Sequence, residues 1–414
     1  MKKGTTALFL MTALNVGLCA CQSDSKNESG IGELPEAEPI RLRLAEKVAA
    51  DNTFALDLFR TACRFAKPAE NVFVSPVSVS MALNMAANGA NGVTRDEMFA
   101  ALRERDYTME EVNEYSRSLR TALMEVDPST AFSIANSIWY RQGFPVKAPF
   151  IDVNRENYDA EVNEIDFASP DALRQINGWC ARKTRDKITE IVEQINGNVM
   201  ILINAVYFKG VWRSKFKEKD TEKADFHLPD GSVRKVDMMR QTASFSYTAD
   251  EYAGYLELPY GNQAFSMMVI LPHEGRTPDE VTARLDREYW NERMSLLARQ
   301  PVNLRLPRFK TENKYLLHTD ILPDMGMKAP FSPEADFGGI SDHPLNISSV
   351  IHKTYVEVNE EGTEAAAVTA VNMITSAGGP PPSPIDFRVD RPFLIALCEK
   401  STGIILFMGR MEAV

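Results

Sequence analysis

The chain has 414 residues, and 44% of them are hydrophobic, which is enough for one large core or two medium ones. Its formal net charge is −11, and its lysines and arginines are scattered rather than clustered. Because binding to phosphate groups needs a basic face, these two features argue against a nucleic-acid-binding protein, and no polyanion site is visible in the sequence.

The N-terminus reads as a targeting segment. Lys2 and Lys3 precede the apolar run "ALFLMTALNVGL", which is too short to anchor the chain as a membrane span, and "LCAC" follows it. This pattern resembles a bacterial lipoprotein signal over residues 1–20, with cleavage before Cys21 and lipidation of that cysteine. An ordinary secretory signal is the alternative.

Residues 21–40 contain few apolar side chains, so we expect a flexible polar tether there. The expected location is the bacterial cell envelope. In this interpretation a lipid anchor is the chain's one membrane contact, and the protein is held at the outer membrane or exposed on the surface. Secretion is the alternative location.

Three cysteines lie in the body of the chain, at positions 63, 180 and 398, in apolar or helical surroundings. Their odd number argues against a disulfide scaffold, and their spacing argues against a zinc site. Small buried thiols are the better interpretation.

Helical signals open the body of the chain. Residues 41–66 carry apolar side chains near helical spacing, which predicts an amphipathic helix on the core. "SPVSVSMALNMAANGA" begins with a Ser-Pro helix start and continues on small residues, which predicts a central helix. "SPDALRQINGWCARKTRDKI" predicts another helix, with Leu173, Ile176, Trp179 and Cys180 facing one way.

Strand signals dominate the middle and the end. "FSIANSIWY" alternates, whereas "VMILINAVYFKGVW" and "FSMMVILP" are nearly continuous apolar runs typical of strands buried on both faces. "FLIALCEKSTGIILFMG" reads as a hairpin of two buried strands around "KSTG". The changing period predicts a single α+β domain from residue 41 to 414.

Catalytic patterns are absent from the sequence. It contains no G-x-S-x-G elbow, no H-E-x-x-H and no phosphate-binding loop, and its five histidines show no ligand-like spacing. We therefore expect no catalytic residues, no cofactor and no metal site. A Ser-His-Asp hydrolase site assembled in space stays open as an alternative.

Four long segments together carry a family resemblance. "NVFVSPVSVSMALNMAANGANGVTRDEM", "LINAVYFKGVW", "VNEEGTEAAAVTAV" and "FRVDRPFLIALCEKSTGIILFMGR" resemble the serpins in order and spacing, over nearly all of residues 41–414. The resemblance implies a serpin fold with three β-sheets, about nine helices and an exposed reactive-centre loop, here at about residues 360–386. It also implies a monomer.

In this family, the target protease cleaves the loop and forms an acyl-enzyme. The loop then inserts into the large sheet as a new strand before hydrolysis is complete. An inserted strand alternates its side chains, and one face of this loop would carry only small uncharged ones. Those residues are Thr363, Ala365, Ala367 and Thr369, while Glu364 falls on the solvated face.

The alanine run also favours helix, but the β-prone residues after it favour a strand, and Gly362 supplies a hinge. The residues implied as the loop hinge are Glu360, Glu361, Gly362, Thr363, Glu364, Ala365, Ala366 and Ala367.

Family spacing, counted from Glu360, implies cleavage between Ser376 and Ala377. Thr375, Ile374 and Met373 are alternatives. A small residue before the bond suits the shallow pocket of an elastase-like protease. Met373 or Ile374 would favour chymotrypsin-like, subtilisin-like or papain-like enzymes. Because no lysine or arginine lies between Glu360 and Asp386, a trypsin-like target does not fit.

The resemblance also implies two control regions. The shutter is a polar cluster beneath the point where the large sheet parts, and it would contain Ser75, Ser78, Asn204 and His352. The breach, where an ion pair would hold the hinge, would contain Trp212, Arg308 and Glu360. For His352 an ordinary core histidine is the competing interpretation. A non-inhibitory serpin that acts in binding or storage is the alternative function.

Overall fold

The computed structural model describes residues 35–195, 199–363 and 383–414. Within these ranges the helices are α1 (Lys47–Phe65), α2 (Pro76–Ala87), α3 (Gly92–Ala101), α4 (Met109–Glu125), α5 (Ala148–Tyr158), α6 (Ala172–Lys183), α7 (Pro278–Thr282), α8 (Arg287–Ser295) and α9 (Ile321–Asp324), with 3₁₀ turns η1 (Glu218–Asp220) and η2 (Ala329–Phe331).

The strands are β1 (Val72–Val74), β2 (Ala131–Arg141), β3 (Glu161–Ile165), β4 (Met200–Lys209), β5 (Glu222–His227), β6 (Val233–Ala249), β7 (Ala253–Pro259), β8 (Phe265–Pro272), β9 (Ala298–Pro307), β10 (Phe309–Leu316), β11 (Ile351–Val358), β12 (Ile385–Arg388), β13 (Phe393–Glu399) and β14 (Ile405–Met411). This content confirms the expected α+β class.

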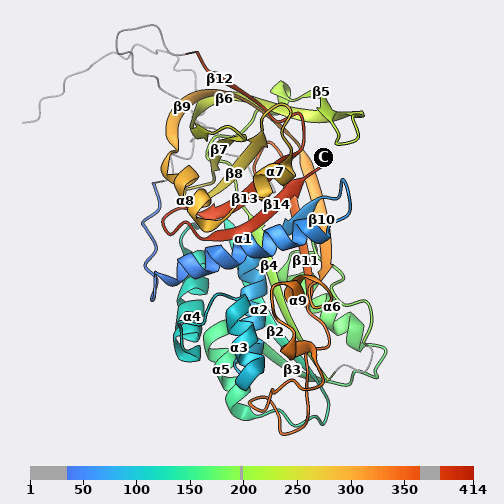
Figure 1. The fold of residues 1–414 in the computed structure, drawn as a ribbon. Coiled ribbons are helices and arrows are strands. Elements are labelled where there is room, and N and C mark those ends of the chain that lie inside the picture. The colour runs from blue at the N-terminus through green and yellow to red at the C-terminus, as the bar shows by residue number, and fades with distance from the viewer. Residues whose placement is uncertain (1–34, 196–198, 364–382) are drawn as a thin grey trace, which may run out of the picture.

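Three sheets organise the described residues. The largest has nine strands, in the order β1-β14-β13-β8-β7-β6-β9-β12 with β5 beside β6. A second sheet has the order β3-β2-β4, and a third pairs β10 with β11. Figure 1 shows the nine-stranded sheet in the upper half of the molecule, with α1 crossing the middle and α2 to α5 below it. The three sheets and nine helices of the described ranges match the expectation.

Helix α1 begins later than the sequence pattern predicted. The expected helix started at residue 41, but residues 43–46 form a turn in which Leu44 has a left-handed φ of 53°. An apolar side chain in that conformation is uncommon, and its hydrophobic spacing imitated one more helical turn. From Lys47 onward the prediction is right, because Phe54, Leu58 and Phe59 are fully buried.

The residues just before the predicted boundary at residue 41 also contact the domain. The Ala37 N–H donates to the Asn262 carbonyl over 2.9 Å, and the Ile40 N–H donates to the Ser401 hydroxyl over 3.1 Å. Ala37 and Ile40 also pack against the main core. The last part of the expected tether therefore lies along the domain, because its few apolar side chains find buried neighbours.

Helix α2 is central, as predicted. Ser75 caps its N-terminus by accepting a hydrogen bond from the Ser78 N–H over 3.4 Å, and Pro76 occupies the first turn. The helix contacts α1, β4 and β14. Small residues on its surface allow these three neighbours to approach closely.

Most predicted strands are confirmed, with one difference in burial. All eight residues of β8 are buried, and β13 pairs with β14 as the expected hairpin. In β4, however, buried and half-buried residues alternate, so this strand is not buried on both faces. Its apolar run is explained by its contacts with helices α2 and α6, which cover β4 only in part.

The cysteines of the described residues are free thiols. Cys63 and Cys180 are buried, and burial raises the pKa of both to about 12, so neither is reactive at neutral pH. Cys398 is partly exposed, which differs from the expectation for that residue. None of the described helices is long and apolar enough to cross a bilayer.

Candidate functional site

The hinge of the predicted loop continues strand β11. Val358 still pairs with Phe309 of β10, and the Gly362 region then forms an isolated bridge with Val211, just beyond β4. The Thr363 N–H donates to the Gly210 carbonyl over 2.8 Å. The described end of the hinge is therefore bonded to the chain that follows β4.

A bidentate ion pair holds this hinge at Glu360, which is 3% exposed. Arg308 Nε lies 2.8 and 2.7 Å from the two carboxylate oxygens of Glu360, and Arg308 Nη2 lies 2.6 Å from Oε1. The Thr221 hydroxyl donates to the same carboxylate over 2.5 Å. Burial alone would raise the pKa of Glu360, but the hydrogen bonds from Arg308 and Thr221 outweigh it and lower the pKa.

Aromatic stacking supports the same hinge. The Trp212 ring stacks on Tyr260 with centroids 4.4 Å apart and an interplanar angle of 13°. Trp212 Nε1 donates to the Asn359 carbonyl over 2.9 Å, and the Tyr260 hydroxyl lies 2.8 Å from the Thr363 hydroxyl. The structure thus brings the predicted breach residues together and places one aromatic pair against both ends of the hinge.

The predicted shutter residues also gather, in two hydrogen-bonded pairs. The Ser75 N–H donates to His352 Nε2 over 2.9 Å, while the Ser75 hydroxyl donates to the Leu406 carbonyl over 2.9 Å. Burial lowers the pKa of His352 to about 3, so the ring is neutral at physiological pH. Ser75 offers His352 its backbone and not its hydroxyl, so this pair lacks the geometry of a nucleophile and its base.

The second pair joins α2 to β4. The Ser78 hydroxyl donates to Asn204 Oδ1, and Asn204 Nδ2 donates to Asn136 Oδ1 over 2.6 Å. Because Ser75 and Ser78 lie on one helix, that helix is bonded both to β11, through His352, and to β4, through Asn204. The polar cluster therefore bridges the two separate sheets from below.

Strands β4 and β11 each have one unshared edge within the described part of the chain. There β4 pairs with β2 alone, and β11 pairs with β10 alone. We call the boundary between these two edges the seam. Small cavities of about 40 and 20 Å³ lie along it, the first lined by Leu202 and Val350 and the second by Tyr207 and Tyr355. A row of strand donors and acceptors thus faces the seam on each side.

Four contributors were missed by the sequence reasoning. Thr221 and Tyr260 touch the hinge directly, Lys215 pairs with Glu361 over 2.9 Å, and Asn136 extends the polar cluster. The chain segments that carry them are distant in sequence from the hinge and contain no motif. Only the buried environment of Tyr260 and Asn136 distinguishes these two from ordinary polar residues.

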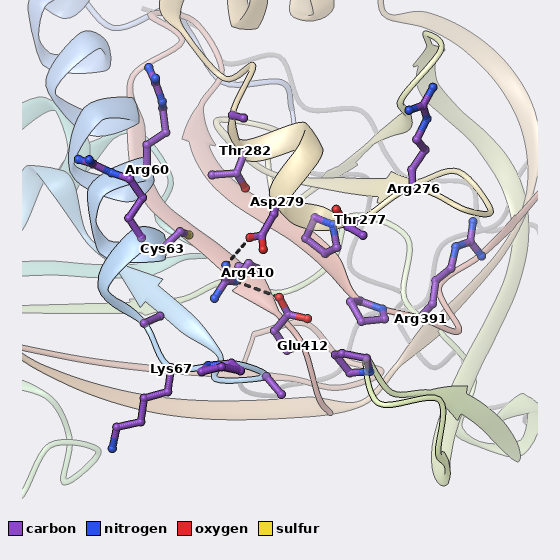
Figure 2. A pocket seen from close by; sticks show the side chains of 18 of the residues that line it. Arg60, Cys63, Lys67, Arg276, Thr277, Asp279, Thr282, Arg391, Arg410 and Glu412 are labelled. Atoms are coloured by element: carbon purple, nitrogen blue, oxygen red, sulfur yellow. Dashed lines mark hydrogen bonds and ion pairs between the residues drawn. The ribbon is translucent and has the colours of Figure 1, made fainter.

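A further cavity lies elsewhere among the described residues and does not involve the hinge. It measures about 1000 Å³ and lies between the C-terminal end of α1 and α7. At its centre Arg410 stands 2.5 Å from Asp279 and 3.1 Å from Glu412, and Figure 2 shows Arg60 and Arg391 at its edge pointing away from this group. The central charges largely compensate one another, so we assign no function to this cavity.

Several predicted site residues lie outside the described residues. They are Cys21, the hinge residues Glu364, Ala365, Ala366 and Ala367, and the bond candidates Met373, Ile374, Thr375, Ser376 and Ala377. Among the residues that are described, no group of three side chains could hold a metal ion.

Comparisons with known proteins identify the family. A sequence profile of the family described as "Serpin (serine protease inhibitor)" matches residues 49–413. The chain is 34% identical over 384 residues to the leukocyte elastase inhibitor of Homo sapiens, with 89% of this chain and 100% of the relative covered. It is 36% identical over 377 residues to Iris of Ixodes ricinus, with 87% and 97% covered.

Solved structures give the same result. A thermophilic serpin, tengpin, in the native state superposes with a TM-score of 0.81 and 29% identity over 92% of this chain and 97% of tengpin. Thyroxine-binding globulin in complex with thyroxine gives a TM-score of 0.79 and 26% identity over 89% and 99% of the two chains. The chain belongs to the serpin family.

Proposed function

We propose that this serpin is a suicide inhibitor of serine proteases, and that it traps its target as a covalent acyl-enzyme by loop insertion. The observation that carries the proposal is the pair of edges on β4 and β11 that no other strand of the described ranges shares, with the hinge at Thr363 already bonded to Gly210 beside β4. A segment that continues from this hinge can add a strand along both edges.

The chemistry divides into cleavage and insertion. The protease serine attacks the carbonyl carbon of Ser376, the peptide bond to Ala377 breaks, and the new amine takes the proton while an ester links Ser376 to the protease. The freed segment then forms strand hydrogen bonds, each with a net contribution of about 1 kcal/mol. Stability gained in this way would move the protease before water hydrolyses the ester.

Geometry permits a long displacement. The segment from Thr363 to Ser376 spans roughly 46 Å as a strand at about 3.3 Å per residue. The size expected for a domain of this length corresponds to a diameter of about 50 Å. Insertion would therefore carry an attached protease nearly from one end of the molecule to the other.

The proposed targets are elastase-like or subtilisin-like proteases that accept small or apolar residues, and papain-like cysteine proteases are a second class. The similarity to leukocyte elastase inhibitors supports the first of these. The absence of lysine and arginine between Glu360 and Asp386 argues against trypsin-like enzymes. Tethering at the bacterial envelope through Cys21 would present the inhibitor to proteases outside the cell.

A non-inhibitory role is the second candidate. One structural neighbour is a globulin that binds thyroxine, so the same fold also supports binding of a small molecule. The small uncharged residues of the hinge favour inhibition, because bulky or charged residues on the inserting face would have to be buried.

Incubation with pancreatic elastase, followed by denaturing electrophoresis and mass spectrometry, tests the proposal. We expect a complex that survives boiling in detergent and a released peptide that begins at Ala377 or within about two residues of it, since the ester persists once the protease is distorted. Cleavage without a complex, repeated with subtilisin and papain, would favour the non-inhibitory role.

A further inference from the structure

Three arginines from three neighbouring strands lie side by side on the nine-stranded sheet. Arg240 of β6 is in register with Arg305 of β9, and Arg305 is in register with Arg388 of β12. Residues directly opposite one another in a sheet point to the same face, so the three side chains form one row. We call these three residues the arginine row.

The row faces outward. Arg240 and Arg388 are exposed and Arg305 is half-buried, while the alternating residues Met239, Leu304 and Phe387 are buried on the other face. Figure 1 shows β6, β9 and β12 together at the top of the molecule, far from α3 and α5. The guanidinium groups are therefore presented to solvent at one end of the protein.

Carboxylates lie beside the two outer members of the row but not beside its centre. Arg240 pairs with Glu222 over 2.8 Å, whereas Arg388 reaches Asp386 only at 3.5 Å. Arg305, at the centre, has no ion-pair partner among the residues that the structure describes. Like charges placed directly opposite one another destabilise a sheet, so the unpaired Arg305 between two other arginines is unfavourable for stability.

A cavity lies beside the row and is lined in part by two of its arginines. This cavity, of about 370 Å³, is lined by Arg305 and Arg388, by Lys223 and Lys235 of the β5–β6 hairpin, and by three carboxylates. These carboxylates belong to Glu222, Asp225 and Asp390, and each is already ion-paired, with Arg240, Lys235 and Arg391 respectively. Both lysines already pair with aspartates, at 2.9 and 2.8 Å. The free positive charge of this concave surface is therefore concentrated on Arg305 and Arg388.

The row is close to the proposed reactive bond. Eleven peptide units separate Ala377 from Arg388, and a chain of that length spans at most about 40 Å even when fully extended. A protease domain of about 250 residues has a diameter of about 45 Å. A protease positioned on the bond can therefore reach the arginine row.

We propose that the arginine row is an accessory docking site that recruits proteases with an acidic surface beside the active-site cleft. This inference rests on the proposed function, because it names a property of the target protease. Opposite charge on the partner would steer encounter and relieve the repulsion within the row. The overall charge of −11 repels acidic proteins in general, so the row supplies local attraction where the loop is presented.

Binding of an inactivated protease tests the row without requiring inhibition. Pancreatic elastase is first sulfonylated at its active-site serine, and half of it is then succinylated, which replaces each lysine ammonium by a carboxylate. Affinity for the mature chain from Cys21 is measured by thermophoresis at about 10 mM ionic strength, where the Debye length is about 30 Å. Because the blocked enzyme forms no ester, loss of the proposed inhibition leaves this measurement intact.

Two matched triple variants isolate the effect of position. Arg240→Gln, Arg305→Gln and Arg388→Gln together remove the row, and the control combines Arg95→Gln, Arg155→Gln and Arg174→Gln on α3, α5 and α6. Each triple variant lowers the net charge by three. A third protein replaces all three row arginines by lysine. It keeps the charge, so it separates the loss of charge from the effect of substituting these three positions.

We expect the row variant to bind the succinylated enzyme at least about tenfold more weakly than the wild type, since steering by clustered charge changes association rates by 10-fold or more. The control and the lysine variant should stay within about twofold, and the difference should vanish near 1 M salt. Equal weakening by the row and control variants would overturn the proposal, as would no preference of the wild type for the succinylated enzyme over the unmodified one.

Discussion

Arg308 binds the Glu360 carboxylate through two hydrogen bonds from Nε and a third contact from Nη2, all within 2.8 Å. Arg308 lies between β9 and β10, so a single side chain ties the hinge to the junction of two sheets. Glu360 is almost fully buried, while the Arg308 side chain is 41% exposed. Release of the hinge therefore requires separation of a charge pair of which one member has no access to water.

Removing Arg308 should loosen this hinge. Arg308→Gln leaves the buried Glu360 carboxylate without its cation, and we expect a loss of about 2 kcal/mol, less than for a fully buried pair because Arg308 is partly solvated. Thermal unfolding of the native form measures the loss. The double variant with Glu360→Gln should recover part of it, whereas strictly additive losses would contradict a direct coupling.

The same pair predicts a pH dependence. The pKa of Glu360 is lowered in the folded state, so its contribution is present above the unfolded glutamate pKa of about 4.3 and is lost as the pH falls through the lower folded value. The difference in thermal midpoint between wild type and Arg308→Gln should thus be constant from pH 7 to 5 and shrink below about pH 4. A difference that does not change with pH would exclude this assignment.

The buried His352 also predicts that the protein is less stable in acid. Here protonation would place a charge on a buried ring, whereas protonation of Glu360 removes one. Its folded pKa is about 3, well below the unfolded value of about 6.5, so the unfolded chain binds the proton more tightly. Stability is complete above pH 6.5 and falls by about 1.4 kcal/mol per unit as the pH drops from 6.5 toward 3. His352→Gln should flatten the profile of the thermal midpoint between pH 6.5 and 5.

His318 serves as the control for this profile. Burial also lowers the pKa of His318. However, His318 is only part-buried, with the Val350 N–H donating to its Nδ1, whereas His352 is buried. His318→Gln should therefore flatten the same profile less than His352→Gln does. If the two variants have equal effects, then His352 is not the dominant acid-sensitive group.

Gly362 should tolerate no side chain. Its φ is 146°, and a Cβ there would lie 2.1 Å from the Gly210 carbonyl oxygen and 2.8 Å from the Val211 Cα. Because both are backbone atoms, Gly362→Ala must displace the hinge, and we expect a loss of about 1 to 3 kcal/mol in thermal stability. The control Gly231→Ala has a φ of 82° but no atom within 4 Å of the new Cβ, so it reports the conformational cost alone.

A charge at Thr363 should separate cleavage from trapping. Thr363 is 4% exposed, and its hydroxyl bonds to Tyr260. Thr363→Arg would require burial of a guanidinium without a partner, which costs several kcal/mol and slows insertion. Elastase should then cleave the loop with little stable complex on denaturing gels, while Thr363→Ser keeps the complex. An undiminished complex with Thr363→Arg would count against insertion through this hinge.

Much of the site was accessible from the sequence because local chemistry specifies it. The Ser75 cap precedes Pro76, which fixed the start of α2, and the resemblance supplied Arg308, Glu360, Ser78 and His352 as members of two clusters. Thr221 and Tyr260 were not predictable, since a hydroxyl on an ordinary segment carries no signal until the fold brings it to Glu360 or Thr363. The start of α1 was misplaced because Leu44 has helical spacing but a left-handed backbone.

Residue type and short-range periodicity were enough to identify the family, the main strands along the chain and the uncharged inserting face of the loop. Which distant charges become neighbours, in contrast, depends on how the strands pair in the folded protein. Arg240, Arg305 and Arg388 are scattered along the chain, and the sequence showed no cationic cluster. Pairing of β6 with β9 and of β9 with β12 aligns them, and these pairings join segments that are far apart in the sequence, so no short stretch of it shows the three arginines together.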